Sequence, residues 1–154
     1  MATLTRSAST VIARSPDDVY DLIADVTRMG DWSPVCKACW WDEGAGPTVG
    51  AWFTGRNEMG DRTWETRSEV VAADRGREFA WVVSATGTRW GYQLEAVDGG
   101  TQVTETWAFP PEGVKVFEER FGDDADAQIE LRGEWARTGM PETLAAIKGT
   151  AESG

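Results

Sequence analysis

The side chains that could do acid–base or nucleophilic chemistry in this chain are few, because one residue type is missing. The 154 residues include no histidine. This absence excludes Ser-His-Asp and Cys-His nucleophile systems, and also zinc sites with histidine ligands. Any acid–base chemistry would therefore use a carboxylate, a tyrosine, a lysine, an arginine or water.

Glu105 and Tyr92 are the two candidates for such acid–base chemistry. Residue alternation places Glu105 on one strand face with Val103 and Trp107, and Tyr92 on one face with Trp90. A carboxylate among rings loses hydration, so we expect the pKa of Glu105 to be raised. Both are candidate catalytic residues if the protein is an enzyme. The alternative is that Glu105 forms a buried pair with an arginine.

Cys36 and Cys39 form a Cys-x-x-Cys pair and are the only cysteines of the chain. In a redox motif the pair stands at the start of a helix, which lowers the pKa of a thiol. Here both fall in a predicted strand, 35–41, on opposite faces. Two thiolates also cannot complete a tetrahedral metal site alone. We expect free thiols and no metal site, with redox or metal use as the alternative.

These residues are set among an unusual number of large rings. Nine tryptophans occur in the chain, and in the predicted strands 62–73, 77–84, 88–97 and 101–109 the rings share one parity. Charged and amide side chains fill the other parity, so one face is aromatic and the other faces water. The predicted inward set comprises Phe53, Asn57, Trp64, Thr66, Ser68, Phe79, Trp81, Trp90, Tyr92, Glu105 and Trp107.

The order of elements predicts one α+β domain, residues 1–154. A first strand (4–13) is followed by a helix starting at Ser15-Pro16, a short turn at 27–32, and a series of hairpins that ends at Pro110-Pro111. A long C-terminal helix follows. We expect Gly139-Met140-Pro141 to kink or break that helix and residues 149–154 to be a flexible tail.

The C-terminal helix is expected to cover the aromatic face, with small residues at its middle. Gly133, Ala136 and Gly139 lie there, and glycine within a helix costs about 1 kcal/mol relative to alanine. Small residues opposite large rings either interlock into a full core or leave a cavity. Because Thr66, Ser68 and Glu105 are expected among the rings, we predict a ligand cavity of about 300 Å³ or more. Ala136 and Met140 would line it from the helix.

The charge balance limits the partners. The chain carries 15 Lys and Arg against 26 Asp and Glu, a net charge of −11. That field repels phosphate backbones and anionic headgroups, so we expect neither nucleic acid nor a membrane as partner. No apolar stretch approaches the roughly 20 residues of a spanning helix, and residues 1–10 lack a signal-peptide core. The expectation is a cytoplasmic protein without a cofactor, either monomer or homodimer.

Four segments together resemble the START-related superfamily called SRPBCC, and within it the polyketide cyclase/dehydrase branch of small actinobacterial proteins. They are residues 25–34 (DVTRMGDWSP), 49–57 (VGAWFTGRN), 100–107 (GTQVTETW) and 139–148 (GMPETLAAIK). The resemblance implies the helix-grip fold: a seven-stranded bent antiparallel sheet around a long C-terminal helix, with two short helices between strands one and two. It also implies a hydrophobic cavity.

The resemblance leaves the function open. Aromatase/cyclases similar to this chain carry an inward arginine on the strand matched by 64–73, where Val70 stands here; Arg56 and Arg89 have outward parity. The first hypothesis is a binding protein for a small hydrophobic, flat metabolite: a polyketide, an isoprenoid or a lipid. The second is a polyketide cyclase, aromatase or dehydratase that uses Glu105 or Tyr92. The third is an interaction domain that uses the outer face of the sheet.

Overall fold

The computed structural model describes residues 3–43 and 46–153, and it confirms the α+β helix-grip architecture. One antiparallel sheet has the strand order β1-β7-β6-β5-β4-β3-β2. Its strands are β1 (Leu4–Ile12), β2 (Cys36–Trp41), β3 (Trp52–Met59), β4 (Arg62–Asp74), β5 (Glu78–Val83), β6 (Arg89–Val97) and β7 (Gly100–Phe109). The helices are α1 (Pro16–Ile23), the 3₁₀ helix η1 (Val26–Asp31), α2 (Pro111–Phe121), the 3₁₀ turn η2 (Gly122–Asp124) and α3 (Ala125–Ser153).

The two short helices α1 and η1 connect β1 to β2. The Ser15 side chain caps α1 by accepting a hydrogen bond from the Asp18 backbone N–H, and Pro16 occupies the first turn, where a missing donor costs nothing. Val19, Tyr20 and Ile23 are the buried face of α1. They join the core formed by the neighbouring part of the sheet.

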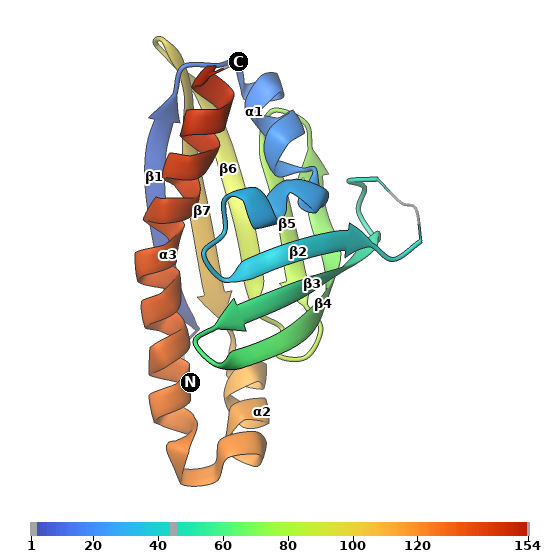
Figure 1. The fold of residues 1–154 in the computed structure, drawn as a ribbon, viewed down its shortest axis with the longest axis vertical. Helices are drawn as coiled ribbons and strands as arrows, with labels where there is room; N and C mark the ends of the chain where they lie inside the picture. Colours follow the sequence, from blue (N-terminus) through green and yellow to red (C-terminus); the bar gives the residue numbers. More distant parts are fainter. Residues whose placement is uncertain (1–2, 44–45, 154) are drawn as a thin grey trace.

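The sheet is strongly bent, as the family resemblance implied. β1, β7 and β6 run along α3, whereas β2, β3 and β4 run beside it at a steep angle to its axis (Figure 1). The pairing register shifts at two places, between Cys36 and Ala38 in β2 and between Val70 and Ala72 in β4. Bulges of this kind bend a strand and increase its twist. The bend gives the sheet a concave face that turns toward α3.

Helix α3 is one continuous helix of 29 residues, so the expected break at Gly139-Met140-Pro141 is not present. Proline removes the N–H that would bond the carbonyl four residues earlier, that of Arg137. Both Arg137 and Pro141 are exposed, so water can satisfy that carbonyl. Gly139 meanwhile lies against the Pro34 ring, where an added Cβ would come within 3.2 Å of it.

The expectation of a flexible tail at residues 149–154 is wrong for the part that the structure describes. α3 continues to Ser153, and Ala151 is buried. The Arg14 guanidinium donates to the Ala151 carbonyl at 2.9 Å, which supplies a partner that the end of a helix otherwise lacks. Gly154 lies outside the described residues. Within the described chain, no helix combines the length and the apolar character needed to cross a membrane.

Candidate functional site

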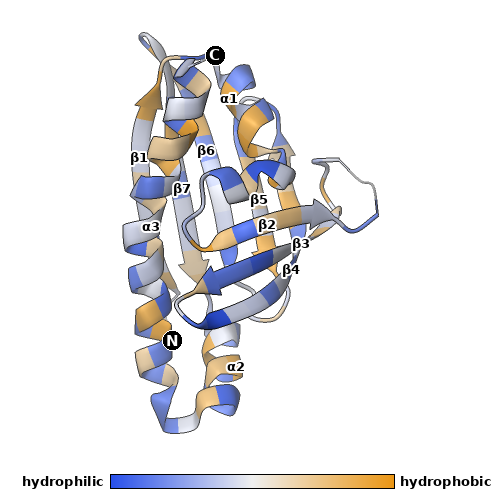
Figure 2. Ribbon diagram, viewed as in Figure 1, coloured by the Kyte–Doolittle hydropathy of each residue, from blue (hydrophilic) through white to orange (hydrophobic). Residues whose placement is uncertain are grey.

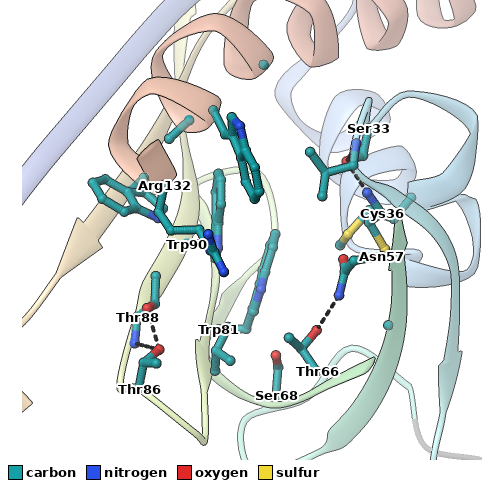
Figure 3. A pocket seen from close by; sticks show the side chains of 18 of the residues that line it. Ser33, Cys36, Asn57, Thr66, Ser68, Trp81, Thr86, Thr88, Trp90 and Arg132 are labelled. Atoms are coloured by element: carbon teal, nitrogen blue, oxygen red, sulfur yellow. Dashed lines mark hydrogen bonds between the residues drawn. The ribbon is translucent and has the colours of Figure 1, made fainter. Parts of the chain in front are cut away.

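A pocket of about 320 Å³ lies between the concave face of the sheet and α3 (Figure 3). Its size is at the low end of the range for small-molecule sites. All of the residues predicted to line a cavity do line it, except Phe79. Residues beyond the predicted set also line the pocket: Met29, Ser33, Pro34, Val35, Cys36, Cys39, Gly55, Arg62, Glu65, Val83, Ala85, Thr86, Thr88, Phe109, Phe117, Arg120, Arg132, Trp135, Gly139 and Thr143.

Phe79 and Gly133 have the expected orientation but not the expected place. Phe79 is fully buried and packs edge-on against Tyr20 of α1, with 6.1 Å between the ring centres. It is therefore covered by α1 and does not line the pocket. Gly133 faces Leu4, Arg6 and Trp107, whose nearest atoms would make ordinary van der Waals contacts of 3.4–3.7 Å with an added Cβ. Of the small residues of α3, Gly133 therefore packs on β1 and β7, whereas Ala136 and Gly139 border the pocket.

Aromatic rings make the apolar wall of the pocket. Phe53 and Trp81 meet at 5.8 Å with an interplanar angle of 71°, and Trp81 meets Tyr92 at 6.1 Å. On the side nearer α2, Trp107 and Phe109 are stacked at 5.9 Å. Pairs of this geometry fix each other's orientation and stabilise the fold by about 0.5–1.5 kcal/mol each beyond their burial. The wall is therefore rigid and suited to a flat apolar molecule.

Glu105 and Tyr92 are the buried titratable residues that the sequence pointed to. They are cross-strand partners on β7 and β6, with exposed fractions of 4% and 2%. Burial raises the pKa of Glu105 well above its ordinary value, and the neighbouring Tyr92 hydroxyl opposes that rise. The pKa of Tyr92 is raised by burial first and then by the neighbouring Glu105. In the part of the chain that the structure describes, Glu105 Oε1 has no hydrogen-bond partner. The pocket thus contains a carboxyl group that favours its protonated form.

A second polar group enters the pocket from β3 and β4. The Asn57 side-chain amide donates to Thr66 Oγ1 at 3.2 Å and, more weakly, to the Trp64 carbonyl at 3.4 Å. Ser68 is buried two residues further along β4 and points to the same space (Figure 3). Asn57, Thr66 and Ser68 therefore give the opposite wall three small polar side chains within an otherwise apolar surface.

Cys36 and Cys39 lie on the same face of β2, which corrects the expectation of opposite faces. The bulge at Lys37 adds one residue between them, so both thiols point into the pocket with their Sγ atoms 3.3 Å apart. Both are free. The hydrogen bond between the two thiols lowers the pKa of Cys36 and raises that of Cys39. Among the described residues, no group of three His, Cys, Asp or Glu is placed to hold a metal ion.

The pocket is also lined by Arg132 of α3, which was not among the predicted lining residues. Val70, at the place of the inward arginine of similar cyclases, is fully buried and apolar, and Arg56 and Arg89 pair with Glu65 and Glu78. Arg132 instead reaches into the pocket from α3 (Figure 3). Helical spacing contained a signal for this placement, because Arg132 precedes Ala136 by one turn and Met140 by two.

Comparison with solved structures places this architecture among similar proteins. A solution NMR structure of the Polyketide_cyc-like protein Cgl2372 from Corynebacterium glutamicum is 49% identical, with a TM-score of 0.72 over 98% of this chain and 93% of that one. The di-domain ARO/CYC proteins StfQ, of the steffimycin pathway, and BexL, of the BE-7585A pathway, share the fold at 17% and 14% identity, with TM-scores of 0.74 and 0.76. The alignments cover 98% and 97% of this chain, and 51% and 50% of theirs.

The family assignment agrees with these likenesses. A search of proteins of curated function gave no significant match. The family model described as "Polyketide cyclase / dehydrase and lipid transport" matches residues 1–141, which contain all seven strands and every pocket-lining residue of α3 except Thr143. A bent sheet that grips a helix around an aromatic pocket is thus found together with a family match over most of the sequence, and the chain belongs to the polyketide cyclase / dehydrase and lipid transport family.

Proposed function

We propose that the protein binds one small, hydrophobic and largely flat metabolite, of the polyketide, isoprenoid or lipid kind, in the pocket between the sheet and α3. The observation that carries this proposal is the rigid aromatic wall of Phe53, Trp81, Tyr92 and Trp107 around a space of about 320 Å³. Apolar walls with a few polar groups are typical of ligand sites. Asn57 supplies one such polar group.

A neutral fluorescent probe tests the proposal. N-phenyl-1-naphthylamine has a flat apolar framework and gains fluorescence when it leaves water. We expect saturable binding of one probe per chain. Ala136→Phe places a ring in the pocket from a position that is 3% exposed and should reduce the affinity at least tenfold. Ala145→Phe, on the exposed face of the same helix, is the matched control and should leave the affinity unchanged.

Two results would contradict this function. The first is no saturable binding of the probe by the folded wild-type protein. The second is equal affinity for the probe in wild type, Ala136→Phe and Ala145→Phe, which would place the probe elsewhere. Thermal unfolding of the three proteins establishes that each is folded under the conditions of the titration.

A second candidate function is acid–base catalysis on a poly-β-keto chain, and the Glu105–Tyr92 pair favours it. A raised pKa favours the protonated form of the carboxyl group, which can then donate a proton to a ligand carbonyl oxygen as that oxygen gains charge. Among the described residues, Glu105 Oε1 has no hydrogen-bond partner and is available for such a contact. Tyr92 lies beside the carboxyl group across the strand pair and would help to orient it.

The exchange of one atom separates the two functions. Glu105→Gln keeps the size and the hydrogen-bonding capacity of the side chain but not its transferable proton. If the protein only binds its ligand, the affinity should change about tenfold or less, near 1.4 kcal/mol. If Glu105 is a general acid, the affinity should persist while turnover of a poly-β-keto thioester falls by roughly 10²–10⁴-fold. Unaltered turnover in Glu105→Gln would exclude this catalytic role.

A further inference from the structure

We propose that the mouth of the pocket is a subsite for an anionic group, so that the ligand is an amphipathic anion whose flat apolar body fills the cavity. This inference rests on the proposed function, since it concerns the same ligand. Its basis is a cluster of three lining arginines, Arg62, Arg120 and Arg132; the first two are exposed and the third is half-buried, so the cluster lies where the pocket meets solvent. We refer to these three residues as the mouth arginines.

The mouth arginines come from three separate elements and meet without carboxylate partners. Arg62 begins β4, Arg120 stands in the last turn of α2, and Arg132 is in the second turn of α3. The β3–β4 hairpin, hydrophilic toward its turn, lies beside α3 and near α2 (Figures 1 and 2). Within residues 3–43 and 46–153, none of the three forms an ion pair. In a chain of net charge −11, such a cluster requires an explanation.

Stacking on aromatic rings holds Arg132 in place. Its guanidinium carbon lies 4.7 Å from the ring centre of Trp135 and 5.8 Å from that of Trp64, and these two indoles are themselves stacked at 6.0 Å. The guanidinium carbon of Arg62 also lies over Trp64, 5.4 Å from its ring centre. Stacking uses the flat face of a guanidinium and leaves the N–H groups at its edge for hydrogen bonds. One of them donates to Gln128 Oε1 at 3.3 Å.

The cluster is electrostatically strained in the absence of an anion. Burial lowers the pKa of Arg132 to about 10, and the positive charges of Arg62 and Arg120 contribute to the same shift. Arg132 nevertheless remains a cation at neutral pH. Three like charges near one another repel. A bound anion would relieve that repulsion and accept hydrogen bonds from two or more of their N–H groups.

The acidic residues that line the pocket do not supply this anion. Glu65 belongs to the outward parity of β4 and has its carboxylate 3.9 Å from Arg56. Glu105 lies deep in the pocket, and its raised pKa favours the uncharged form. The edge of a guanidinium matches the geometry of a planar carboxylate and also binds phosphate. A carboxylic acid or phosphate ester with a fused-ring body would therefore place its anion at the mouth and its rings against Trp81 and Trp107.

Two probes with the same ring framework provide the test. 1-Anilinonaphthalene-8-sulfonate is N-phenyl-1-naphthylamine with one added anionic group. The net charge of −11 would by itself disfavour the sulfonate. We expect the wild-type protein to bind the sulfonate about tenfold more tightly than the neutral probe. Arg132→Gln should remove this preference and change the affinity for the neutral probe about threefold or less.

Variants at exposed sites keep the test independent of the packing of Arg132. Arg120→Gln and Arg62→Gln should each weaken binding of the sulfonate selectively, by about threefold or more. Arg77→Gln removes the same charge at a position that does not line the pocket and should have no selective effect. Raised salt should weaken only the sulfonate. Displacement of the sulfonate by 1-naphthoate and by 1-naphthyl phosphate ranks the two natural anion types.

The outcomes separate the two proposals. Equal affinity of the wild-type protein for both probes, or equal losses in Arg120→Gln and Arg77→Gln, would overturn the anion subsite and leave the hydrophobic cavity intact. Failure of both probes to bind would overturn the cavity as a ligand site, and the subsite with it. A preference for the sulfonate that disappears in Arg132→Gln, falls in Arg120→Gln and Arg62→Gln, and persists in Arg77→Gln would establish the subsite.

Discussion

Tyr92 and Glu105 face each other across β6 and β7, and their polar groups are buried together in a pocket whose walls are otherwise largely aromatic. Burial raises the pKa of Glu105, and the neighbouring Tyr92 hydroxyl limits the rise. A buried carboxyl group without a charged partner is costly to ionise. This pair therefore couples the protonation of the pocket to the stability of the fold.

The first prediction follows from that coupling. Below the ordinary glutamate pKa of 4.5, both the folded and the unfolded protein hold the Glu105 proton. Above it the unfolded chain loses the proton while the folded protein keeps it, so the free energy of unfolding falls as the pH rises toward the raised pKa. The slope is at most about 1.4 kcal/mol per pH unit. Glu105→Gln should lack this component.

Urea unfolding of wild type and Glu105→Gln between pH 4.5 and 8 measures it. The difference in stability between the two proteins should grow with pH in favour of the variant, and then level off. Comparison with the variant removes the contributions of the other acidic residues, which both proteins share. Parallel stability curves across this range would show that the pKa of Glu105 is not raised in the folded protein.

The second prediction concerns the hydroxyl of Tyr92. Tyr92→Phe keeps the ring against Trp81 and removes the hydroxyl that opposes the rise in the pKa of Glu105. Loss of a partner of a buried polar group costs about 1–3 kcal/mol. We expect a loss of stability in this range in urea unfolding of Tyr92→Phe. In the double variant Tyr92→Phe/Glu105→Gln, the loss in the free energy of unfolding should be smaller than the sum of the changes in the two single variants. Strict additivity would show that the two side chains do not interact.

Alternation of residue types predicted most of the fold and of the aromatic wall. Trp64, Trp81, Trp90 and Trp107 line the pocket because a strand of period two leaves only two choices of face, and polar residues occupied the other. The family resemblance supplied what alternation could not: the bend of the sheet and the position of the last helix. The distinction between pocket and core at Phe79 depended on where α1 packs, which no local pattern contains.

The two misplaced or missed groups have separate physical causes. A bulge at Lys37 reverses the parity of β2, so strict alternation put Cys36 on the wrong face relative to Cys39. Gly30 of η1 lies against the Lys37 carbonyl and is part of that local arrangement. Arg132 was missed because a charged side chain on a helix is normally assigned to water. The surrounding rings of Trp64, Trp135 and Phe117 come from three elements, and only the fold brings them together.

The third prediction concerns the order in which the two thiols react. The hydrogen bond from Cys39 lowers the pKa of Cys36, whereas that of Cys39 is raised. Because the thiolate is the reactive form, iodoacetamide should alkylate Cys36 first, and an occupied pocket should protect it. Peptide mass spectrometry of partially labelled protein reads the site directly. Cys39→Ala tests the cause, because alanine cannot form the hydrogen bond: it should slow alkylation of Cys36.

The thiols are also expected to be dispensable for binding. Cys36→Ser and Cys39→Ser should each cost about 1–2 kcal/mol of stability, since both side chains are buried, and should leave the affinity for N-phenyl-1-naphthylamine nearly unchanged. Preferential alkylation of Cys39 would contradict the assignment of the lower pKa to Cys36. Loss of binding in a folded serine variant would show that a thiol contacts the ligand.

The fourth prediction tests the packing that forms the bulge. A Cβ at Gly30 would collide with the Lys37 carbonyl, which is backbone and cannot easily shift. Gly30→Ala should therefore destabilise the protein by about 1–3 kcal/mol. Gly149→Ala is the contrasting change, because nothing lies within 4 Å of its added Cβ and α3 is helical there. It should stabilise by up to about 1 kcal/mol. Equal effects in thermal unfolding would contradict the close contact at Gly30.

The tryptophans permit the most direct test of ligand binding in this pocket. Trp64, Trp81, Trp90, Trp107 and Trp135 line it, whereas Trp32, Trp40, Trp41 and Trp52 do not. Titration of ¹⁵N-labelled protein with N-phenyl-1-naphthylamine should shift the indole N–H signals of the first group, saturably and with one dissociation constant, and leave those of the second group nearly in place. Saturable shifts confined to the second group, or no shifts at probe concentrations that saturate the fluorescence, would contradict binding between the sheet and α3.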